Sequence, residues 1–275
     1  MLAKRILTGI IGGAATIGII YEGNWLFFLM MLVLSLVGWL EYTTMTSKLK
    51  LNVADRTGAV WLICFFGAYW FGAVKLMFFL FFVLMVWLLL RTVFFHTVAK
   101  PADSAYTLYG LLYIGGGFLA MLALRSGTLA SYVTDYFGIV MLEPARFILY
   151  LVVFSTWASD TFAFAFGKLW GKTKLCPTIS PGKTQEGAIG GVIGTIVVAL
   201  IFSLIFKFSL IHGLAIGVIV AIAAPLGDLA ESILKRVCGV KDSGHIIPGH
   251  GGVLDRFDSL FFAAPAVYMY LLLIA

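Results

Sequence analysis

Long apolar runs alternate with short clusters of charged and turn-forming residues along the whole 275-residue chain. Most runs approach the roughly 20 residues that an α-helix needs to cross a bilayer, although the third is shorter, at about 14 residues. The pattern predicts an all-α fold, that of a polytopic integral membrane protein with about nine transmembrane helices. The expected spans are Ile6–Tyr21, Trp25–Leu40, Gly58–Phe71, Leu76–Leu90, Tyr106–Leu124, Phe147–Phe166, Ala188–Phe206, Leu210–Leu226 and Phe257–Ala275.

Composition agrees with a membrane location and excludes a soluble globule. Apolar residues make up 61% of the chain, 24 residues are Phe, and the mean hydropathy is +1.04. Such a chain has too little polar surface to cover a soluble domain. We expect residues 1–145 to form a transmembrane scaffold and residues 146–275 to form a catalytic region, with polar signature loops at 167–187 and 227–258.

Lysine and arginine are unevenly distributed between the two sides of this predicted arrangement. With the N-terminus in the cytoplasm, 15 of the 19 fall in inner segments, and only Lys75, Arg125, Arg146 and Lys207 fall in outer ones. Cytoplasmic loops of membrane proteins carry such an excess of positive charge. We therefore expect a multi-pass protein of a bacterial plasma (inner) membrane with its polar segments facing the cytoplasm. The net charge of +6 suits an anionic inner leaflet and needs no nucleic-acid partner.

The segment from Ser232 to Asp258 is dense in charge for a chain with only 12% charged residues. It combines carboxylates with basic side chains, a mixture that suits a polyphosphate held by a divalent cation. Glycines beside His250 add positions where the backbone can approach an anion closely. The residues of interest are Asp228 and Glu231 just upstream, followed by Ser232, Lys235, Arg236, Lys241, Asp242, His250, Gly251, Gly252, Asp255, Arg256 and Asp258.

Helical spacing groups several of these side chains. On a helix that continues past Asp228, Ser232 and Lys235 share its face, and Glu231 can pair with Lys235 at i, i+4. The two carboxylates of the Asp-Arg-x-Asp motif at 255–258 share a face at the start of the last predicted helix. Two carboxylate clusters that converge from different helix ends favour a site for a metal-bound nucleotide.

The segment 167–187 contains two Gly-Lys-Thr tripeptides, at 171–173 and 182–184. A P-loop needs a further glycine five residues before its Gly-Lys pair, and neither tripeptide has one. The element upstream is also a membrane span and not a strand, so the P-loop motif fails in sequence and in context. What remains is a basic, glycine-containing loop able to bind phosphate or a nucleotide through Ser180, Lys183, Thr184 and Glu186.

Asp160 lies near the cytoplasmic end of the sixth predicted span. A carboxylate at membrane depth costs about 2.5–3.5 kcal/mol on insertion scales, so it normally faces a cavity or a partner. Two interpretations stay open for Asp160: a structural pairing with a lysine of the loop, and direct contact with the substrate.

Two sequence blocks resemble a known family. The block S-x-[apolar]-K-R-x4-K-D-x-G-x2-I-P-x-H-G-G-[apolar]-x-D-R-F-D, from Ser232 to Asp258, is similar to the signature of the phosphatidate cytidylyltransferases, also called CDP-diacylglycerol synthases. The second block consists of S-D-T-F-A at 159–163 and S-P-x-K-T-x-E-G at 180–187. Gln185 stands where the family often has Trp, between the polar positions of that block.

The resemblance implies the reaction CTP + phosphatidate → CDP-diacylglycerol + pyrophosphate in a homodimeric, all-helical membrane enzyme. It implies Mg²⁺ as cofactor with a monovalent cation, K⁺, beside it, and it makes Asp228 and Asp255 the metal ligands. Lys241, Asp242, Arg256 and Asp258 then complete the catalytic site. The implied substrate-binding residues are Asp160, Ser180, Lys183, Thr184, Glu186, Ser232, Lys235, Arg236, His250, Gly251 and Gly252.

Two other functions remain as alternatives. A CTP-dependent polyprenol or phytol kinase would share cytidine binding but would transfer the γ-phosphoryl group to an alcohol. A transporter of a phosphorylated solute would use the basic loops and Asp160 but has no need of the Asp-Arg-x-Asp cluster. The favoured mechanism is in-line attack of a phosphatidate oxygen on the α-phosphorus of CTP, catalysed mainly by positioning and electrostatic stabilisation.

Overall fold

The computed structural model of the protein describes residues 2–126, 143–246 and 251–274. Twelve helical elements and one short hairpin make up this part of the chain. The helices are α1 (Leu2–Glu22), α2 (Asn24–Ser47), α3 (Asp55–Trp70), α4 (Val74–Phe94), α5 (Pro101–Gly110), the π-helix η1 (Leu111–Gly115), α6 (Gly116–Arg125), α8 (Pro144–Trp170), α9 (Gln185–Ile205), α10 (Leu210–Val237), α11 (Leu254–Phe257) and α12 (Leu260–Ile274).

The helices confirm an all-α, multi-pass membrane protein. Six helical stretches are long and apolar enough to cross a bilayer: α2 with its extension to Leu49, α4, the continuous α5–η1–α6 stretch, α8, α9 and α10. Large apolar side chains also point outward, including Phe78, Phe79 and Phe82 of α4, which are 73%, 63% and 71% exposed. Such a surface suits lipid and not water. The 16-residue α3 and the shorter apolar helices at 11–22 and in α12 leave the nine-span count a prediction.

A small antiparallel hairpin interrupts the helices. Strands β1 (Lys174–Cys176) and β2 (Ser180–Thr184) pair with Lys174 opposite Thr184. The hairpin lies within 167–187, where the sequence predicts a loop. Thr184 ends the hairpin and begins α9, because its hydroxyl oxygen accepts a hydrogen bond from the Gly187 N–H at 3.1 Å.

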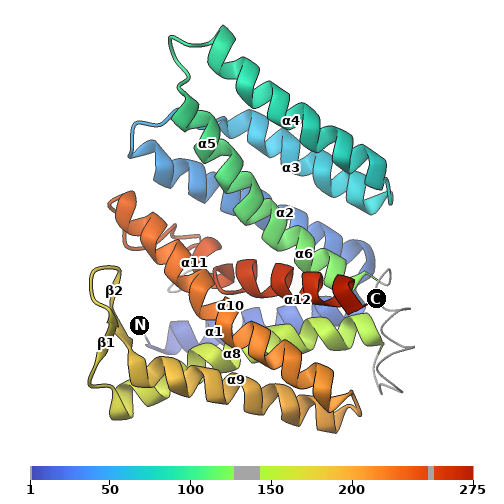
Figure 1. Ribbon diagram of the computed structural model, residues 1–275, viewed down its shortest axis with the longest axis vertical. Helices are drawn as coiled ribbons and strands as arrows, with labels where there is room; N and C mark the ends of the chain where they lie inside the picture. The colour runs from blue at the N-terminus through green and yellow to red at the C-terminus, as the bar shows by residue number, and fades with distance from the viewer. Residues whose placement is uncertain (1, 127–142, 247–250, 275) are drawn as a thin grey trace.

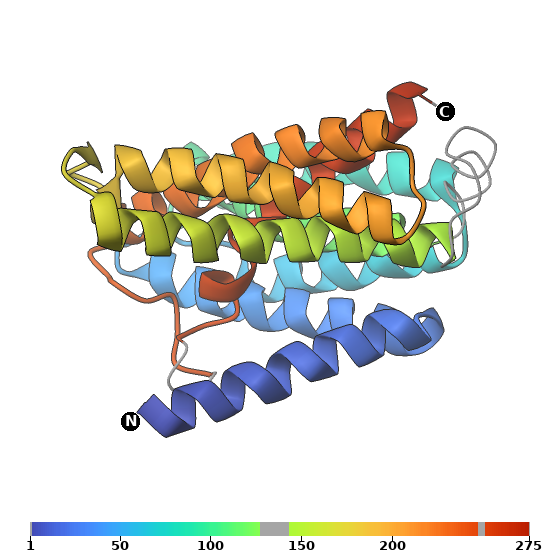
Figure 2. The same cartoon turned by 90° about the horizontal axis from the view of Figure 1, so that it is seen from below.

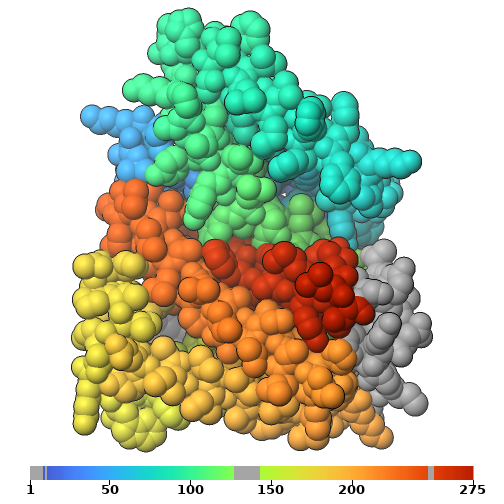
Figure 3. Space-filling view, in the orientation of Figure 1, coloured from blue at the N-terminus to red at the C-terminus, as the bar shows by residue number. Residues whose placement is uncertain are grey.

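The helices run back and forth between two ends of the molecule (Figure 1). One end carries the β1–β2 hairpin, the C-terminus of α10 and the short α11, so the two signature segments meet there. Helices α8, α9 and α10 form one layer, and α12 lies between α10 and α6 (Figures 1 and 3). Helix α1 runs along the side of the bundle (Figure 2), where the Arg125 Nε donates to the Ile20 carbonyl at 2.7 Å.

Glycines allow α8 and α9 to pack at close range. Gly187, Gly190, Gly191 and Gly194 are all buried on α9. A methyl group on Gly190 would overlap the Cβ and Cγ atoms of Phe166, and one on Gly191 would lie 3.1 Å from the Ser159 carbonyl oxygen. Small residues at such spacing let membrane helices approach closely. The packing fixes the end of α8 that bears Asp160 beside the start of α9.

The predicted last span begins with a break. Helix α11 ends at Phe257, and α12 starts only at Leu260. Gly227 of α10 lies against this break, where a side chain would meet the Asp258 carbonyl oxygen. The close approach brings the Asp-Arg-x-Asp motif next to Asp228.

Candidate active site

A cavity of about 710 Å³ opens at the hairpin end of α8, α9 and α10. Its walls come from both signature segments, which are distant in sequence. Carboxylates and basic side chains face the same space, together with glycines and apolar residues. The predicted site residues that line the cavity are Asp160, Ser180, Lys183, Thr184, Asp228, Lys235, Asp242, Asp255, Arg256 and Asp258.

An ion pair connects the two signature segments across this cavity. The Lys183 Nζ of β2 lies 2.7 Å from the Asp228 Oδ2 of α10, and both side chains are partly exposed, at 24% and 31%. The Ser232 hydroxyl, one turn along α10, donates to the other Asp228 oxygen at 3.4 Å. A partly exposed pair of this kind can exchange partners at low cost. Lys183 is therefore available to a phosphate that enters the cavity.

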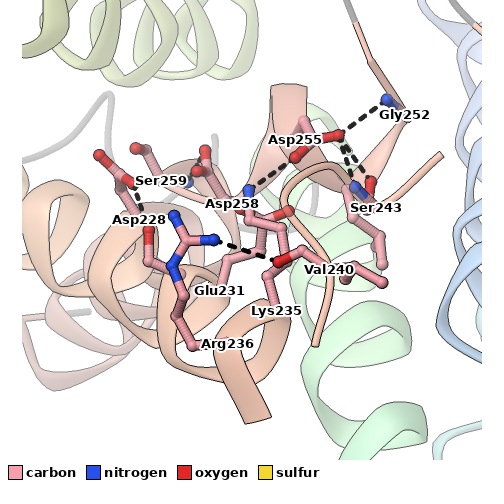
Figure 4. A network of polar contacts seen from close by, with 12 residues as sticks. Asp228, Glu231, Lys235, Arg236, Val240, Ser243, Gly252, Asp255, Asp258 and Ser259 are labelled. Carbon is pink, nitrogen blue, oxygen red and sulfur yellow. Dashed lines mark hydrogen bonds and ion pairs between the residues drawn. The ribbon is translucent and has the colours of Figure 1, made fainter. Parts of the chain in front are cut away.

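Lys235 joins two acidic side chains on the inner wall (Figure 4). Its Nζ lies 2.6 Å from the Asp255 Oδ1 and also forms an ion pair with Glu231, whose side chain is fully buried. The predicted i, i+4 pairing of Glu231 with Lys235 is thereby confirmed. Lys235 thereby joins α10 to the end of the signature loop and places one positive charge between the two acidic groups.

The Asp255 carboxylate is surrounded by donors. Its Oδ2 accepts hydrogen bonds from the Ser243 N–H at 2.9 Å, the Ser243 hydroxyl at 2.9 Å and the Gly252 N–H at 2.8 Å. Burial alone would raise the pKa of Asp255, but the hydrogen bonds from Lys235 and these donors outweigh burial and lower the pKa to about 2. Asp255 is therefore ionised at neutral pH and anchors the end of the signature loop.

Two other carboxylates of the cavity, Asp258 and Asp160, have fewer hydrogen-bond donors and cations in contact with them, among the described residues, than Asp255 has. Burial and then the neighbouring Asp228 carboxylate raise the pKa of Asp258 to about 7, and the charge of Asp160 acts in the same direction. Asp160 is exposed to the cavity, and it forms no ion pair within the described parts of the chain. Of the two interpretations of Asp160, direct contact with a bound molecule agrees better with this position.

The carboxylate oxygens of the cavity are the kind of ligand that Mg²⁺ prefers. Within the described residues, no three His, Cys, Asp or Glu side chains lie close enough to form a metal site by themselves. Mg²⁺ usually keeps several waters and takes one or two protein carboxylates together with substrate phosphates. Asp228, once Lys183 turns to a substrate phosphate, and the neighbouring Asp258 can supply such carboxylates. Asp228 and Asp255 as the ligands stay a prediction. The Asp255 Oδ1 accepts one hydrogen bond, from Lys235, and keeps a second lone pair that a metal could use.

Several predicted site residues hold the local structure. The Glu186 carboxylate accepts hydrogen bonds from the Lys172 and Thr173 N–H groups, each at 3.1 Å, and thereby ties the start of α9 to the start of the hairpin. The Arg236 guanidinium donates to the Ile179 carbonyl at 3.2 Å, so it holds the hairpin turn against α10. Lys241 is exposed and does not line the cavity, and His250 lies outside the described residues.

The two adjacent glycines, Gly251 and Gly252, lie close to carboxylates of the protein itself. Gly251 has a positive φ of 85°, and a methyl group there would lie 2.6 Å from the Asp255 Oδ2. A methyl group on Gly252 would lie 2.5 Å from an oxygen of Glu41 in α2. Glycines at these positions do let the backbone approach negatively charged groups, as expected. The groups are side chains of the protein, Asp255 and Glu41, and not a bound anion.

Comparison with known proteins places this arrangement in a family. The sequence profile of the cytidylyltransferase family matches residues 3–274, nearly the whole chain. The chain belongs to this family.

Individual relatives have names that specify the substrate, which the family name does not. The chain is 33% identical over 274 residues to a phosphatidate cytidylyltransferase of Staphylococcus aureus (strain COL), and the match covers 98% of each protein. It is 41% identical over 174 residues to a phosphatidate cytidylyltransferase of Staphylococcus haemolyticus (strain JCSC1435), covering 62% of this chain and 60% of the relative. The predicted family and the predicted nucleotidyltransferase class are confirmed.

One residue that was not predicted reaches the site from the scaffold half. Glu41 lies on α2, is only 4% exposed, and accepts hydrogen bonds from the Val253 and Leu254 N–H groups. The predicted second span ends at Leu40, one residue before Glu41, and no role was predicted for Glu41. Helix α2 instead continues to Ser47, and a carboxylate inside it was the available signal.

Proposed function

We propose that the protein transfers the cytidylyl group of CTP to phosphatidate, releasing pyrophosphate and forming CDP-diacylglycerol. The observation that carries this proposal is the 98% coverage of a relative named phosphatidate cytidylyltransferase. The charged cavity supports it, because Lys183, Arg256 and several carboxylates there suit a nucleotide triphosphate with its cation.

The cavity residues would act mainly by position and charge. Lys183 would leave Asp228 to contact the CTP phosphates, and the exposed Arg256 would neutralise charge that develops on the departing pyrophosphate. A phosphatidate oxygen then attacks the α-phosphorus as the bond from that phosphorus to the β-phosphate bridging oxygen breaks. The attacking phosphate is already ionised at neutral pH, so the reaction needs little help from a general base.

Magnesium would be held at Asp228 with Asp255, and the Asp258 carboxylate lies next to the same position. When bound, it would neutralise the triphosphate and polarise the phosphorus that is attacked. K⁺ beside it remains an expectation from the family resemblance. Lys235, by contrast, would keep the Glu231 and Asp255 carboxylates in place during the reaction.

An apolar groove suits the acyl chains of the lipid substrate. The groove has a volume of about 670 Å³ and runs along α12 between α10 and the α5–η1–α6 stretch. Figure 3 shows α12 on this face, flanked by α6 and α10. Its lining is almost wholly apolar and includes Leu112, Gly116, Ile222, Leu226 and Met269.

Tyr113 lies where the groove approaches the acidic residues. Its ring packs edge-on against Phe261, with ring centroids 5.0 Å apart, and Phe261 follows Asp258 by three residues. The Tyr113 hydroxyl is buried without a hydrogen-bond partner among the described residues, and it lies within range of the charges of Glu231 and Asp258. We propose that acyl chains occupy this groove while the lipid headgroup reaches the charged cavity.

The proposal also includes the surroundings of the enzyme. We expect a homodimer in a bacterial plasma membrane, with the charged cavity facing the cytoplasm, where CTP is present. The excess of Lys and Arg in the segments at the cavity end supports this orientation.

The test is a label-transfer assay with purified enzyme in detergent. CTP labelled in its cytidine should yield labelled lipid when phosphatidate and Mg²⁺ are both present, and chelation of Mg²⁺ should abolish the transfer. Label that reaches lipid only from the γ-phosphate of CTP would instead identify a lipid kinase. Absence of both transfers, with uptake of a phosphorylated solute into vesicles, would identify a transporter.

A further inference from the structure

Glu41 contacts the signature loop from the opposite half of the chain. Its Oε1 accepts the Val253 N–H at 2.9 Å, and its Oε2 accepts the Leu254 N–H at 3.0 Å. The Ser243 hydroxyl also lies 3.3 Å from the Oε2. One carboxylate of α2 thus accepts two main-chain N–H groups and competes with Asp255, which is nearer, for the single proton of the Ser243 hydroxyl.

The loop is shaped to admit this carboxylate. A methyl group on Gly244 would lie 2.6 Å from the Glu41 Oε1, and one on Gly252 would lie 2.5 Å from the Oε2. Real side chains do not tolerate such distances, because they are far inside van der Waals contact. Glycine at both positions therefore lets the backbone close around Glu41.

Glu41 and Asp255 accept hydrogen bonds from neighbouring N–H groups of the same short segment, residues 252–254. Glu41 takes the Val253 and Leu254 N–H groups, whereas Asp255 takes the Gly252 N–H at 2.8 Å. The Ser243 hydroxyl lies between the two carboxylates, 2.9 Å from the Asp255 Oδ2. A displacement of Glu41 would therefore move the backbone that orients Asp255.

The charge of Glu41 indicates a positioning role. Its side chain is 4% exposed, and no basic side chain forms an ion pair with it within the described residues. A buried carboxylate is costly unless donors satisfy it, and here main-chain N–H groups do so. Glutamine would keep the shape but would turn an amide NH₂ toward one of these N–H donors.

We propose that Glu41 is a positioning residue of the active site, which holds residues 252–254 and Ser243 so that Asp255 stays beside Lys235. The inference rests on the proposed cytidylyltransferase reaction at this cavity. Glu41 does not line the cavity, so it acts through Asp255 and not on the substrate. The N-terminal half of the chain thereby contributes to catalysis as well as to the scaffold.

The test compares Glu41→Gln with Thr46→Val on the same helix. Thr46 is fully buried, but its hydroxyl bonds only to carbonyls of α2, those of Tyr42 and Thr43. We expect Glu41→Gln to lower kcat by about 10- to 100-fold, because a displacement of about 1 Å in a site can cost 10²-fold. The KM for CTP should change less than about threefold, because the nucleotide-binding Lys183 and Thr184 are untouched. Thr46→Val should keep the wild-type kcat.

A second measurement does not depend on activity. Trypsin should cleave Glu41→Gln faster than wild type or Thr46→Val at Lys241 and Arg256, which are both exposed and flank the segment that Glu41 holds. Equal cleavage rates together with an unchanged kcat would overturn the proposal. Because cleavage is read without substrate, it tests the positioning even if the wild-type enzyme transfers no cytidylyl group, an outcome that would instead refute the proposed function.

Ser243→Ala keeps the proposal testable if Glu41→Gln does not fold. It removes the hydroxyl that Glu41 and Asp255 share and leaves both carboxylates in place. We expect a smaller loss of kcat and faster cleavage at the same sites. Where both variants fold, the double variant should lose little more activity than Glu41→Gln alone, because the two residues act on one segment. Independent, multiplicative losses, or no loss in Ser243→Ala, would contradict the inference.

Discussion

At the residue scale, the charged side chains of the site fall into two groups. Lys235 pairs with both Glu231 and Asp255, and Asp255 also accepts main-chain N–H groups, so these side chains already have partners within the protein. Lys183 and Asp228 are bound mainly to each other and remain partly exposed. The second group can exchange its partners for a substrate phosphate and a cation, so changes there should affect chemistry more than folding.

Asp228→Asn tests this division. The substitution removes one anionic ligand and the partner of Lys183, so we expect turnover to fall by at least about 10² with little change in expression. The matched control is Asp103→Asn. Asp103 is a buried carboxylate that accepts the Asn52 and Lys100 N–H groups outside the cavity. The control should lower the melting temperature but retain turnover; normal turnover in purified Asp228→Asn would remove Asp228 from the metal role.

At the element scale, the site depends on how closely α8 and α9 pack. Gly190→Ala should destabilise the protein, because the new methyl group meets the Cβ of Phe166, and the backbone of α8 fixes that atom whatever the rotamer. Overpacking typically costs about 1–3 kcal/mol, more than the roughly 1 kcal/mol that alanine gains over glycine in a helix. Gly18→Ala, which meets no atom within 4 Å, is the control. Its melting temperature should stay or rise, and a rise in both variants would refute the packing argument.

The apolar groove is a second element-scale feature. Gly116 lines it, and a Cβ atom there would meet no atom within 4 Å, so Gly116→Leu should extend its side chain into the groove. We expect a several-fold higher KM for long-chain phosphatidate and an unchanged KM for a short-chain, soluble phosphatidate. Gly67→Leu, on α3 and equally free of contacts, should change neither value. An unchanged KM for the long-chain lipid in Gly116→Leu would exclude this groove as the acyl site.

Elements with a strong local pattern could be predicted from the sequence, whereas contacts between distant segments could not. Apolar runs predicted the long helices, and helical spacing predicted the Glu231–Lys235 pair. The β1–β2 hairpin was missed because its strands are only three and five residues long. The contact of Glu41 with the signature loop joins residues more than 200 positions apart, and no local periodicity encodes it.

At the scale of the whole molecule, the arrangement of the helices separates the two ends by a membrane thickness. Helix α9 has 21 residues, which at 1.5 Å per residue span about 30 Å, close to the hydrocarbon core of a bilayer. It begins at the charged cavity and ends before Lys207. We therefore expect the site residues of both signature segments to lie on one side of the membrane and the turn between α9 and α10 to lie on the other.

Two single-cysteine variants test this arrangement in a chain whose three native cysteines are replaced by alanine. Gly182 is exposed on the hairpin with open space around it, and Lys207 lies in the α9–α10 turn. The Lys and Arg asymmetry predicts that the hairpin lies in the cytoplasm. A membrane-impermeant maleimide should therefore label Gly182→Cys only in inside-out vesicles and Lys207→Cys only in right-side-out vesicles. Both variants must first transfer cytidylyl groups at near wild-type rates, which shows that their fold is retained. Labelling of both from the same side would mean that α9 does not cross the bilayer, and labelling with the sides exchanged would place the charged cavity outside the cell, away from CTP.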